Sequence, residues 1–505
     1  MLTYSLENTE NYPMYEYLYR RIRADILSGK IKSGERLPSK RTFADNLGVS
    51  VITVEGAYDM LRAEGYIFSV PKKGFYVNSF ANIPGAPEKK DMPGMQAAPK
   101  SETGANRPGA QTDLENKAGA YRPAGAESKT VQGTPAGPKS KSSLIADFTR
   151  DGTDPGIFPF SIWVKAMRRV VHEKKNDLMK KPPCGGIDEL KCAISKYLSD
   201  FRGMRVNPAQ IVIGAGTEYL YSLLIQIVGR TMTYGIEDPG YHKSAKIYKE
   251  LGVPFKYVGM DGSGVKPCEL EKKNINVIHV SPSHHFPTGI VMPVNRRYEL
   301  LEWVRAGKDR YVIEDDYDSE LRMSGRPLPT LASIDSSDRV IYMNTFTKTL
   351  CSTVRVSYMV LPDALARRFY GELSFYSCTV SNFEQYTLAS FIEDGSFEKH
   401  INRLRRYYQK KRDDFIRILN CHPLGERILI REKEAGVHFI MEIKTKRREE
   451  DVIATAAKEG VILNPVSAYC QDGTAHTQNA YVMNYSALDL KNAQACADAI
   501  FKAAF

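Results

Sequence analysis

The stretch IEDDYDSEL, residues 313–321, places three acidic residues directly after an apolar run. A second apolar run, VIYM at residues 340–343, leads into NTFTKTL, which contains Lys348. Acidic triplets usually belong to solvated loops, and a single lysine is usually a surface residue. If both runs are strands of an open α/β sheet, these polar residues instead follow strand ends at the edge where ligands bind. The rest of the chain decides between the two interpretations.

The region around these two runs has the pattern of an α/β domain. From residue 146 to residue 505, short β-branched runs such as QIVIG, NVIHVSP, RYVIEDD and RVIYMNTF alternate with helical patterns. This alternation predicts an α/β domain with a mostly parallel central sheet. The chain has 505 residues, of which 42% are hydrophobic, so it can form a large core here and still contain a further domain.

Two zones of different composition precede this domain. Residues 81–145 are rich in Gly, Pro, Ala, Ser and Lys, which cannot bury enough apolar surface to fold, so we expect a flexible linker. Residues 12–80 show three helical patterns and then two β-rich runs around a Lys-Lys-Gly turn. Ser39 and Ser50 are the expected N-caps of the second and third helices. This arrangement predicts a winged helix-turn-helix, although a small domain that binds another protein would fit the architecture too.

Composition argues against several classes of protein. The eight cysteines are scattered without CxxC spacing, so we expect reduced thiols and no metal site. We find no charge-free apolar run of about 18 residues, which a membrane helix needs, and the first residues do not resemble a secretion signal. We therefore expect a soluble, cytoplasmic protein. The net charge of +11 fits an anionic partner without identifying one.

Several residues of the large domain suit one ligand. Asp315 ends one expected strand, Lys348 follows another, and Arg355 lies seven residues beyond the lysine, where it could clamp a phosphate. The run IVIGAGTEYLYSLL, residues 211–224, passes from a strand through a glycine turn into a helix whose first amides can bind an anion. An amine, a buried carboxylate and a phosphate site are together what pyridoxal 5'-phosphate (PLP) requires. The amine forms an imine with the cofactor, and the carboxylate keeps the pyridine nitrogen protonated.

The small domain resembles a known family. The segment ILSGKIKSGERLPSKRTFADNLGVSVITVEGAYDMLRAEGYI, residues 26–67, closely resembles the DNA-binding domain of the GntR family of bacterial regulators. The resemblance implies double-stranded DNA as a partner. The residues that it assigns to DNA are, for phosphate contacts, Ser39, Lys40 and Arg41; for the start of the recognition helix, Ser50 and Thr53; and for the tip of the wing, Lys72, Lys73 and Gly74.

One departure from the GntR pattern concerns the choice of DNA sequence. Many relatives have arginine or another long polar residue just after the N-cap of the recognition helix, where this chain has Val51 and Ile52. These side chains could touch thymine methyl groups, but they cannot make a bidentate contact to guanine. The resemblance therefore leaves the operator sequence open.

Residues 146–505 resemble fold-type I aminotransferases, which implies a small C-terminal subdomain beside the central sheet, and the whole chain resembles the MocR branch of the GntR family. The motifs EDPGYH, SPSHHFPTGIVMP, IEDDYDSE, NTFTKTLCSTVR and HINRLRRYYQKKRD carry this resemblance. It implies that Lys348 is the Schiff-base lysine and that Asp315 is the partner of the pyridine nitrogen. The other residues it assigns to the cofactor are Tyr317 at the ring hydroxyl, Tyr241 stacked on the ring, Arg355 at the phosphate with Thr345, Gly216 and Thr217, and His284, either in the pocket wall or in a capping role.

Two departures from the aminotransferase pattern concern the substrate. The position expected to hold the arginine that binds a substrate carboxylate is Val482, and the position of a ring-facing asparagine is Phe286. Lys243, two residues after Tyr241, could compensate in part by binding an effector carboxylate. Because transamination needs a well-oriented amino acid, we favour a sensor over an efficient enzyme.

These observations predict a PLP-dependent transcriptional regulator. Its large domain would sense an amine, an amino acid or PLP itself and would control the winged helix. The resemblance further implies a homodimer that reads paired half-sites, and the long linker permits the winged helix of one chain to rest on the other chain. The main alternative is a working PLP-dependent aminotransferase that carries a DNA-binding domain. The third hypothesis is a binding protein that has lost its cofactor, and the retained Lys348, Asp315 and Arg355 argue against it.

Overall fold

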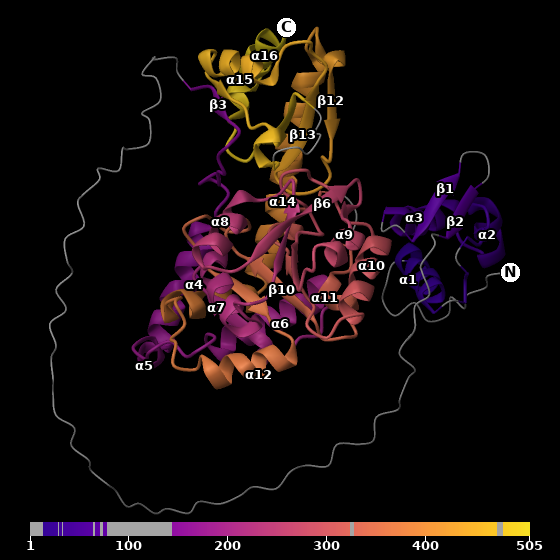
Figure 1. Ribbon diagram of the computed structural model, residues 1–505. Helices are drawn as coiled ribbons and strands as arrows, with labels where there is room; N and C mark the ends of the chain where they lie inside the picture. Colours follow the sequence, from indigo (N-terminus) through magenta and orange to yellow (C-terminus); the bar gives the residue numbers. More distant parts are fainter. Residues whose placement is uncertain are drawn as a thin grey trace, which may run out of the picture. The chain divides into compact units, whose positions relative to one another are not determined.

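The computed structural model describes most of the two predicted domains (Figure 1). The described residues are 14–28, 30–32, 34–63, 66–70, 74–77, 144–323, 328–471 and 478–505. Lys72 and Lys73, expected at the wing tip, lie outside them, as do residues 81–143 of the expected linker. No helix among the described residues is long and apolar enough to cross a membrane.

The N-terminal domain is the predicted winged helix-turn-helix. Its elements are α1 (Met14–Leu27), α2 (Lys40–Leu47), α3 (Val51–Ala63) and an antiparallel pair of strands, β1 (Ile67–Val70) and β2 (Gly74–Val77). The Ser39 hydroxyl accepts the backbone N–H of Thr42 at 3.2 Å, and α2 ends at Gly48 with a φ of 66°. The Ser50 hydroxyl accepts the N–H of Thr53 at 3.1 Å at the start of α3. Both expected N-caps are therefore present.

Tyr58 fixes α3 within this small domain. Its ring is fully buried and lies 6.0 Å from Phe43 of α2 and 5.1 Å from Phe75 of β2, measured between ring centroids. Its hydroxyl donates a hydrogen bond of 2.9 Å to the carbonyl of Pro38, just before α2. The third helix is thus held against both the second helix and the wing, so its N-terminal end has one fixed direction.

A mixed sheet forms the centre of the large domain. Its strands, in spatial order, are β4 (Ile211–Gly214), β11 (Ser357–Val360), β10 (Val340–Thr345), β9 (Tyr311–Asp315), β8 (Val277–Val280), β5 (Tyr234–Asp238), β6 (Phe255–Asp261) and β7 (Gly264–Val265). Strands β10, β9, β8, β5 and β6 are paired in parallel, whereas β11 and β7 run antiparallel to their neighbours. The predicted mostly parallel sheet is confirmed.

Helices cover both faces of this sheet (Figure 1). In β4, Ile211 and Ile213 join the apolar cluster that contains side chains of α6 and α13, whereas Val212 joins the cluster of α7 and α12. Two buried faces explain why the strands read as continuous apolar runs. The helices around the central sheet are α4 (Phe160–Glu173), α5 (Lys175–Leu178), α6 (Asp188–Arg202), α7 (Thr217–Val228), α8 (His242–Glu250), α9 (Pro267–Lys272), α10 (Val294–Arg305), α11 (Leu331–Ile334), α12 (Asp363–Glu372) and α13 (Asn382–Glu393).

A smaller C-terminal subdomain completes the chain, as expected. The long helix α14 (Ser396–Cys421) leads into it. Its antiparallel sheet has the order β12-β13-β15 and packs with two helices around an apolar cluster. The elements are β12 (Ile428–Arg431), β13 (His438–Ile443), α15 (Glu449–Lys458), β15 (Ala480–Asn484), α16 (Ala493–Ala504) and the parallel pair of β3 (Ala146–Asp147) with β14 (Val461–Ile462).

Candidate functional site

The three acidic residues at the end of β9 lie in different environments. Asp315 lines a cavity of about 490 Å³, whereas Glu314 and Asp316 are fully buried on the other side of the strand. Glu314 accepts the backbone N–H groups of the first two residues of α11, each at 2.9 Å. Asp316 forms an ion pair of 2.9 Å with Arg202. Alternation along the strand thus sends one carboxylate to the ligand side and two into the core.

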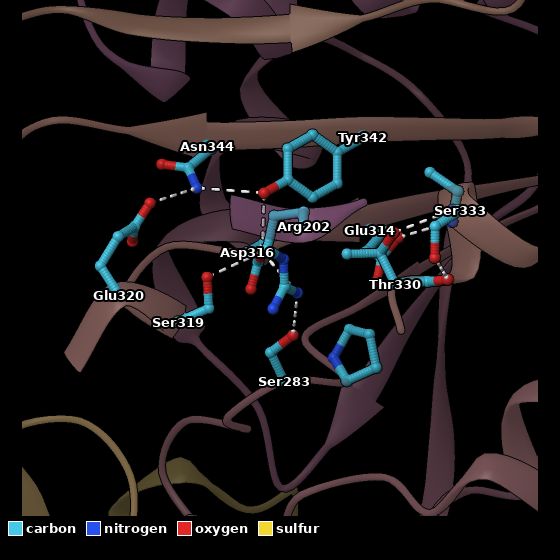
Figure 2. Close-up of polar contacts among 12 residues, drawn as sticks. Arg202, Ser283, Glu314, Asp316, Ser319, Glu320, Thr330, Ser333, Tyr342 and Asn344 are labelled. Atoms are coloured by element: carbon cyan, nitrogen blue, oxygen red, sulfur yellow. Dashed lines mark hydrogen bonds and ion pairs between the residues drawn. The ribbon is translucent and has the colours of Figure 1, made fainter. Parts of the chain in front are cut away.

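Figure 2 shows the buried network around Asp316. Besides pairing with Arg202, Asp316 accepts the hydroxyl of Tyr342 at 2.7 Å and that of Ser319 at 2.9 Å. Arg202, at the end of α6, also donates to Ser283 at 3.0 Å. The network ties α6 to the end of β9, to β10 and to the loop after β8, so it fixes the backbone that carries Asp315.

Lys348 lies in the loop after β10 and lines the same cavity. Its Nζ atom is 2.7 Å from an oxygen of Asp151, and the other oxygen of Asp151 accepts a hydrogen bond of 2.8 Å from Asn484. Burial acts to raise the pKa of Asp151, but the charge and hydrogen bond of Lys348 outweigh it, so the pKa is lowered. Asp151 belongs to the loop before α4 and carries no sequence signal for this role.

Within the described part of the chain, one carboxylate oxygen of Asp315 accepts a hydrogen bond and the other has no donor. Its Oδ2 accepts the hydroxyl of Tyr221 at 2.9 Å. Its Oδ1 is buried and has no hydrogen-bond partner among the described residues. A buried carboxylate oxygen without a donor is costly unless a ligand supplies one. The protonated ring nitrogen of PLP is such a donor, so this residue fits the expected cofactor.

The predicted anion site corresponds to the start of α7. Gly216 caps this helix with a φ of 97°, and a Cβ atom there would clash with the guanidinium of Arg355. Arg355 donates to Glu218 at 2.7 Å, and Lys243 pairs with the other oxygen of the same carboxylate. The helix amides, the arginine and the lysine form an arrangement that binds anions, and a side-chain carboxylate now occupies part of it.

Aromatic and histidine side chains form the remaining walls. Tyr241 and Phe286 meet edge to face at 5.9 Å, and both line the cavity. His284 does not line it: its Nδ1 is 2.8 Å from Asp318, and its ring stacks on that of His438 at 4.4 Å. His438 lines the cavity instead, and burial holds its pKa well below the ordinary value, so the ring is neutral. The structure therefore places His284 behind the wall.

The structure brings most of the predicted cofactor residues together with Lys243, the predicted effector residue. Those that line the cavity are Thr217, Tyr241, Lys243, Asp315, Tyr317, Thr345, Lys348 and Arg355. Among the further wall residues that the sequence did not predict are Asp151, Glu218, His285 and His438. His284 and His285 lie in the loop after β8 and not in a strand, so no alternation rule indicates which of the two faces the ligand.

Glu218 leads to a testable prediction about anion binding. Because its carboxylate occupies Arg355 and Lys243, Glu218→Gln should bind inorganic phosphate about fivefold more tightly, as expected for competing ion pairs worth about 1 kcal/mol at a partly exposed site. Titration calorimetry on the cofactor-free protein measures this. Glu372→Gln, which removes an exposed ion pair with Arg368 on α12, is the matched control. Equal phosphate affinity in the Glu218 variant and the unchanged protein would contradict the prediction.

Comparison with known proteins agrees with both domains. Residues 14–77 match the family described as bacterial regulatory proteins, gntR family, and residues 151–492 match aminotransferase class I and II. The chain is 34% identical to the uncharacterized HTH-type transcriptional regulator YdeL of Bacillus subtilis, over 92% of each chain. It is 31% identical to the probable rhizopine catabolism regulatory protein MocR of Rhizobium meliloti, over 96% of this chain and 92% of that one.

A solved structure shows the same fold for the large domain. The multiple substrate aminotransferase of Thermococcus profundus is 22% identical, with a TM-score of 0.63 over 72% of this chain and 93% of that one. This likeness concerns the fold, whereas the full-length regulators share both domains in the same order. The chain therefore belongs to the MocR branch of the GntR family of bacterial regulatory proteins, in which a winged helix precedes an aminotransferase-like domain.

Proposed function

We propose that this protein is a transcriptional regulator that binds double-stranded DNA through residues 12–80 and holds PLP in residues 146–505. The ligand state of the large domain would control how the winged helices contact the operator. One observation carries this proposal: Lys348, Asp315 and Arg355 converge on a single cavity in a chain whose other domain is of the GntR type.

The cavity supplies a group for each part of the cofactor. Lys348 would hold it covalently, and the free Oδ1 of Asp315 would accept the ring N–H. When bound, PLP supplies an aldehyde carbon that reacts with amines and a ring that withdraws electrons. The residues that would make the other contacts are Arg355, Thr345, Gly216 and Thr217 at the phosphate, Tyr317 at the ring hydroxyl and Tyr241 on the ring face.

The position of Val482 supports a sensor over an efficient aminotransferase. This residue is fully buried on β15 and packs with Ile440 and Val466 behind the cavity wall, so an apolar side chain occupies the position where an enzyme of this fold would need a cation. An α-amino acid would therefore lack one of the contacts that orient it for reaction. Rapid turnover of common amino acids with 2-oxoglutarate would favour the alternative, a working aminotransferase that carries a DNA-binding domain.

Regulation by this chain would involve two copies. Family resemblance supports a homodimer in the cytoplasm, with two winged helices that read paired half-sites and a linker long enough for exchange between chains. The proposal is tested by gel retardation of the promoter fragment of the protein's own gene, with and without PLP or an amine. Retardation that changes with ligand supports a ligand-controlled regulator, and the absence of any retardation contradicts it.

DNA binding should depend on Arg41, which is exposed on α2. Arg41→Ala should weaken binding to all sequences alike and lower the slope of log affinity against log salt by about one, because one phosphate contact is lost. Fluorescence anisotropy at several salt concentrations measures both quantities. Arg448→Ala, at an exposed arginine that starts α15, is the control and should change neither. An unchanged slope in the Arg41 variant would count against the predicted phosphate contact.

The first residues of α3 should instead affect sequence preference. Ile52 is 79% exposed at the start of the recognition helix, and Val51 beside it is 40% exposed. Exposed β-branched side chains at this place suit thymine methyl groups rather than polar base edges. Substitution of Ile52 by alanine would then reduce the preference among operator variants while leaving the salt dependence as it is.

A further inference from the structure

We infer that the effector recognised at this site is a primary amine that carries no carboxylate on the carbon next to its nitrogen. The inference rests on the proposed PLP site and adds the chemical class of its ligand. It follows from how the charges that line the cavity are paired, from the aromatic part of its wall and from the place of Asp151.

Every lysine and arginine that lines the cavity, within the described residues, already has a carboxylate partner. Lys348 pairs with Asp151 at 2.7 Å, and Arg355 pairs with Glu218 at 2.7 Å. Lys243 pairs with Glu218 as well. An effector carboxylate would therefore have to break an existing ion pair, or compete with the cofactor phosphate for Arg355 and Lys243.

Two of the three histidines that line the cavity do not supply the missing positive charge. Burial lowers the pKa of His285 to about 3 and that of His438 well below its ordinary value, so both rings are neutral near pH 7. The third, His279, is engaged on both ring nitrogens, with Tyr221 at 3.4 Å and Tyr248 at 3.2 Å. A neutral imidazole offers an effector hydrogen bonds, but it does not offset the charge of a carboxylate.

One part of the cavity wall is aromatic and is backed by an apolar cluster. Ile440, Val466 and Val482 form a small buried cluster, with Phe286 and Tyr469 packed against it. Phe286 and Tyr469 both line the cavity, and their rings meet edge to face at 5.0 Å. This surface suits the hydrocarbon or aromatic body of a ligand, and burying a charged group against it would be unfavourable.

Asp151 adds a negative charge at the reactive end of the cavity. Its carboxylate lies beside Lys348 Nζ and is held by Asn484, so an amine that approaches the end of the lysine side chain meets a carboxylate. An ammonium group is attracted there. A carboxylate on the adjacent carbon would lie within a few ångströms of Asp151, and two like charges at that distance repel each other. Asp151 therefore selects for amines and against α-amino acids.

The same contacts bear on the role predicted for Lys243. From the sequence, this residue was a candidate to bind an effector carboxylate, but its amine is engaged by Glu218 at the start of α7. A carboxylate-bearing effector would need Glu218 to move away from Lys243. That possibility is the competing outcome in the experiment below.

The test uses pairs of ligands that differ only in the α-carboxylate: tyramine and tyrosine, cadaverine and lysine, ethanolamine and serine. The full-length protein is loaded with PLP, and its visible absorption and its binding heat are followed as each ligand is added. In at least one pair, the amine should bind about tenfold or more tightly than the amino acid. Amino acids that bind as tightly as their amines, or no response to any of the six, would overturn the inference.

Two variants separate recognition by Asp151 from general effects on the loop. Asp151→Asn should raise the Kd of the amine and lower that of the amino acid, so that the ratio within a pair moves toward one. Asp154→Asn is the matched control, because Asp154 lies in the same loop and bonds to Tyr407 instead of lining the cavity. In Asp154→Asn, the ratio of the two Kd values within a pair should equal that of the unchanged protein. If Asp151→Asn also leaves this ratio unchanged, the role assigned to Asp151 is wrong.

The outcomes also distinguish this inference from the proposed function. A protein that never takes up PLP overturns both. A protein that is coloured with PLP but prefers amino acids overturns the choice of ligand alone and leaves the cofactor site and the regulator in place.

Discussion

Lys348→Ala protein should be colourless after incubation with PLP and removal of the free cofactor, whereas the unchanged protein should stay yellow. The amine of Lys348 is the group in the cavity that would bind the cofactor covalently, beside the anion site of Arg355 and the free oxygen of Asp315. Without it, the remaining contacts are reversible, and gel filtration should remove the cofactor completely. Visible absorption of the desalted protein measures the effect.

The control for this experiment is Lys246→Ala, at an exposed lysine of α8 outside the cavity. That variant should keep the full absorption. A Lys348 variant that retains its colour after desalting would show that another amine holds the cofactor, and the assignment of Lys348 would then be wrong.

Asp316→Ala should destabilise the protein by about 3–5 kcal/mol, because it leaves the buried guanidinium of Arg202 without its charged partner. The side chains of Arg202 and Asp316 are 2% and 0% exposed, so water cannot replace the lost contact. The hydroxyl of Tyr342 loses its acceptor in the same change. The urea concentration at the midpoint of unfolding, followed by circular dichroism, measures the loss.

Two further variants show whether the pair itself causes this loss. Asp451→Ala removes an exposed ion pair with Arg448 and should leave the midpoint unchanged. Replacing Asp316 and Arg202 together by apolar residues should recover much of the stability, since no unpaired charge then remains. If Asp316→Ala unfolds at the same midpoint as the unchanged protein, the network in Figure 2 does not have the energetic weight assigned to it.

Much of the fold could be predicted because its signals are local. The N-caps Ser39 and Ser50 act on an N–H group three residues away, so a short segment contains both partners. The apolar runs before Asp315 and Lys348 identified strand ends, and the strand-end rule then placed both residues at one edge of the sheet. The family of each domain followed from motifs of the same short range.

The other contacts of the site could not be predicted because their partners are distant in sequence. Arg202 ends a helix with nothing in its neighbourhood to indicate that it meets Asp316, which directly follows β9. Asp151 reaches Lys348 from a loop that precedes the first helix of the domain. Glu218 lies within the run that predicted the anion site, but its contacts depend on how α7 packs against α8, which carries Lys243, and against the segment before β11, which carries Arg355. Such pairings are set by tertiary packing, which no local pattern encodes.

The alternation along β9 has a consequence for genetics. Codons 314 and 316 encode side chains that are buried in the interior, whereas codon 315 between them encodes a side chain that lines the cavity. A saturation library across these codons should therefore give two classes of phenotype in alternating order. Substitutions at the outer two codons should lower the abundance of the protein in the cell, and those at the middle codon should leave abundance high while abolishing the proposed response to the effector.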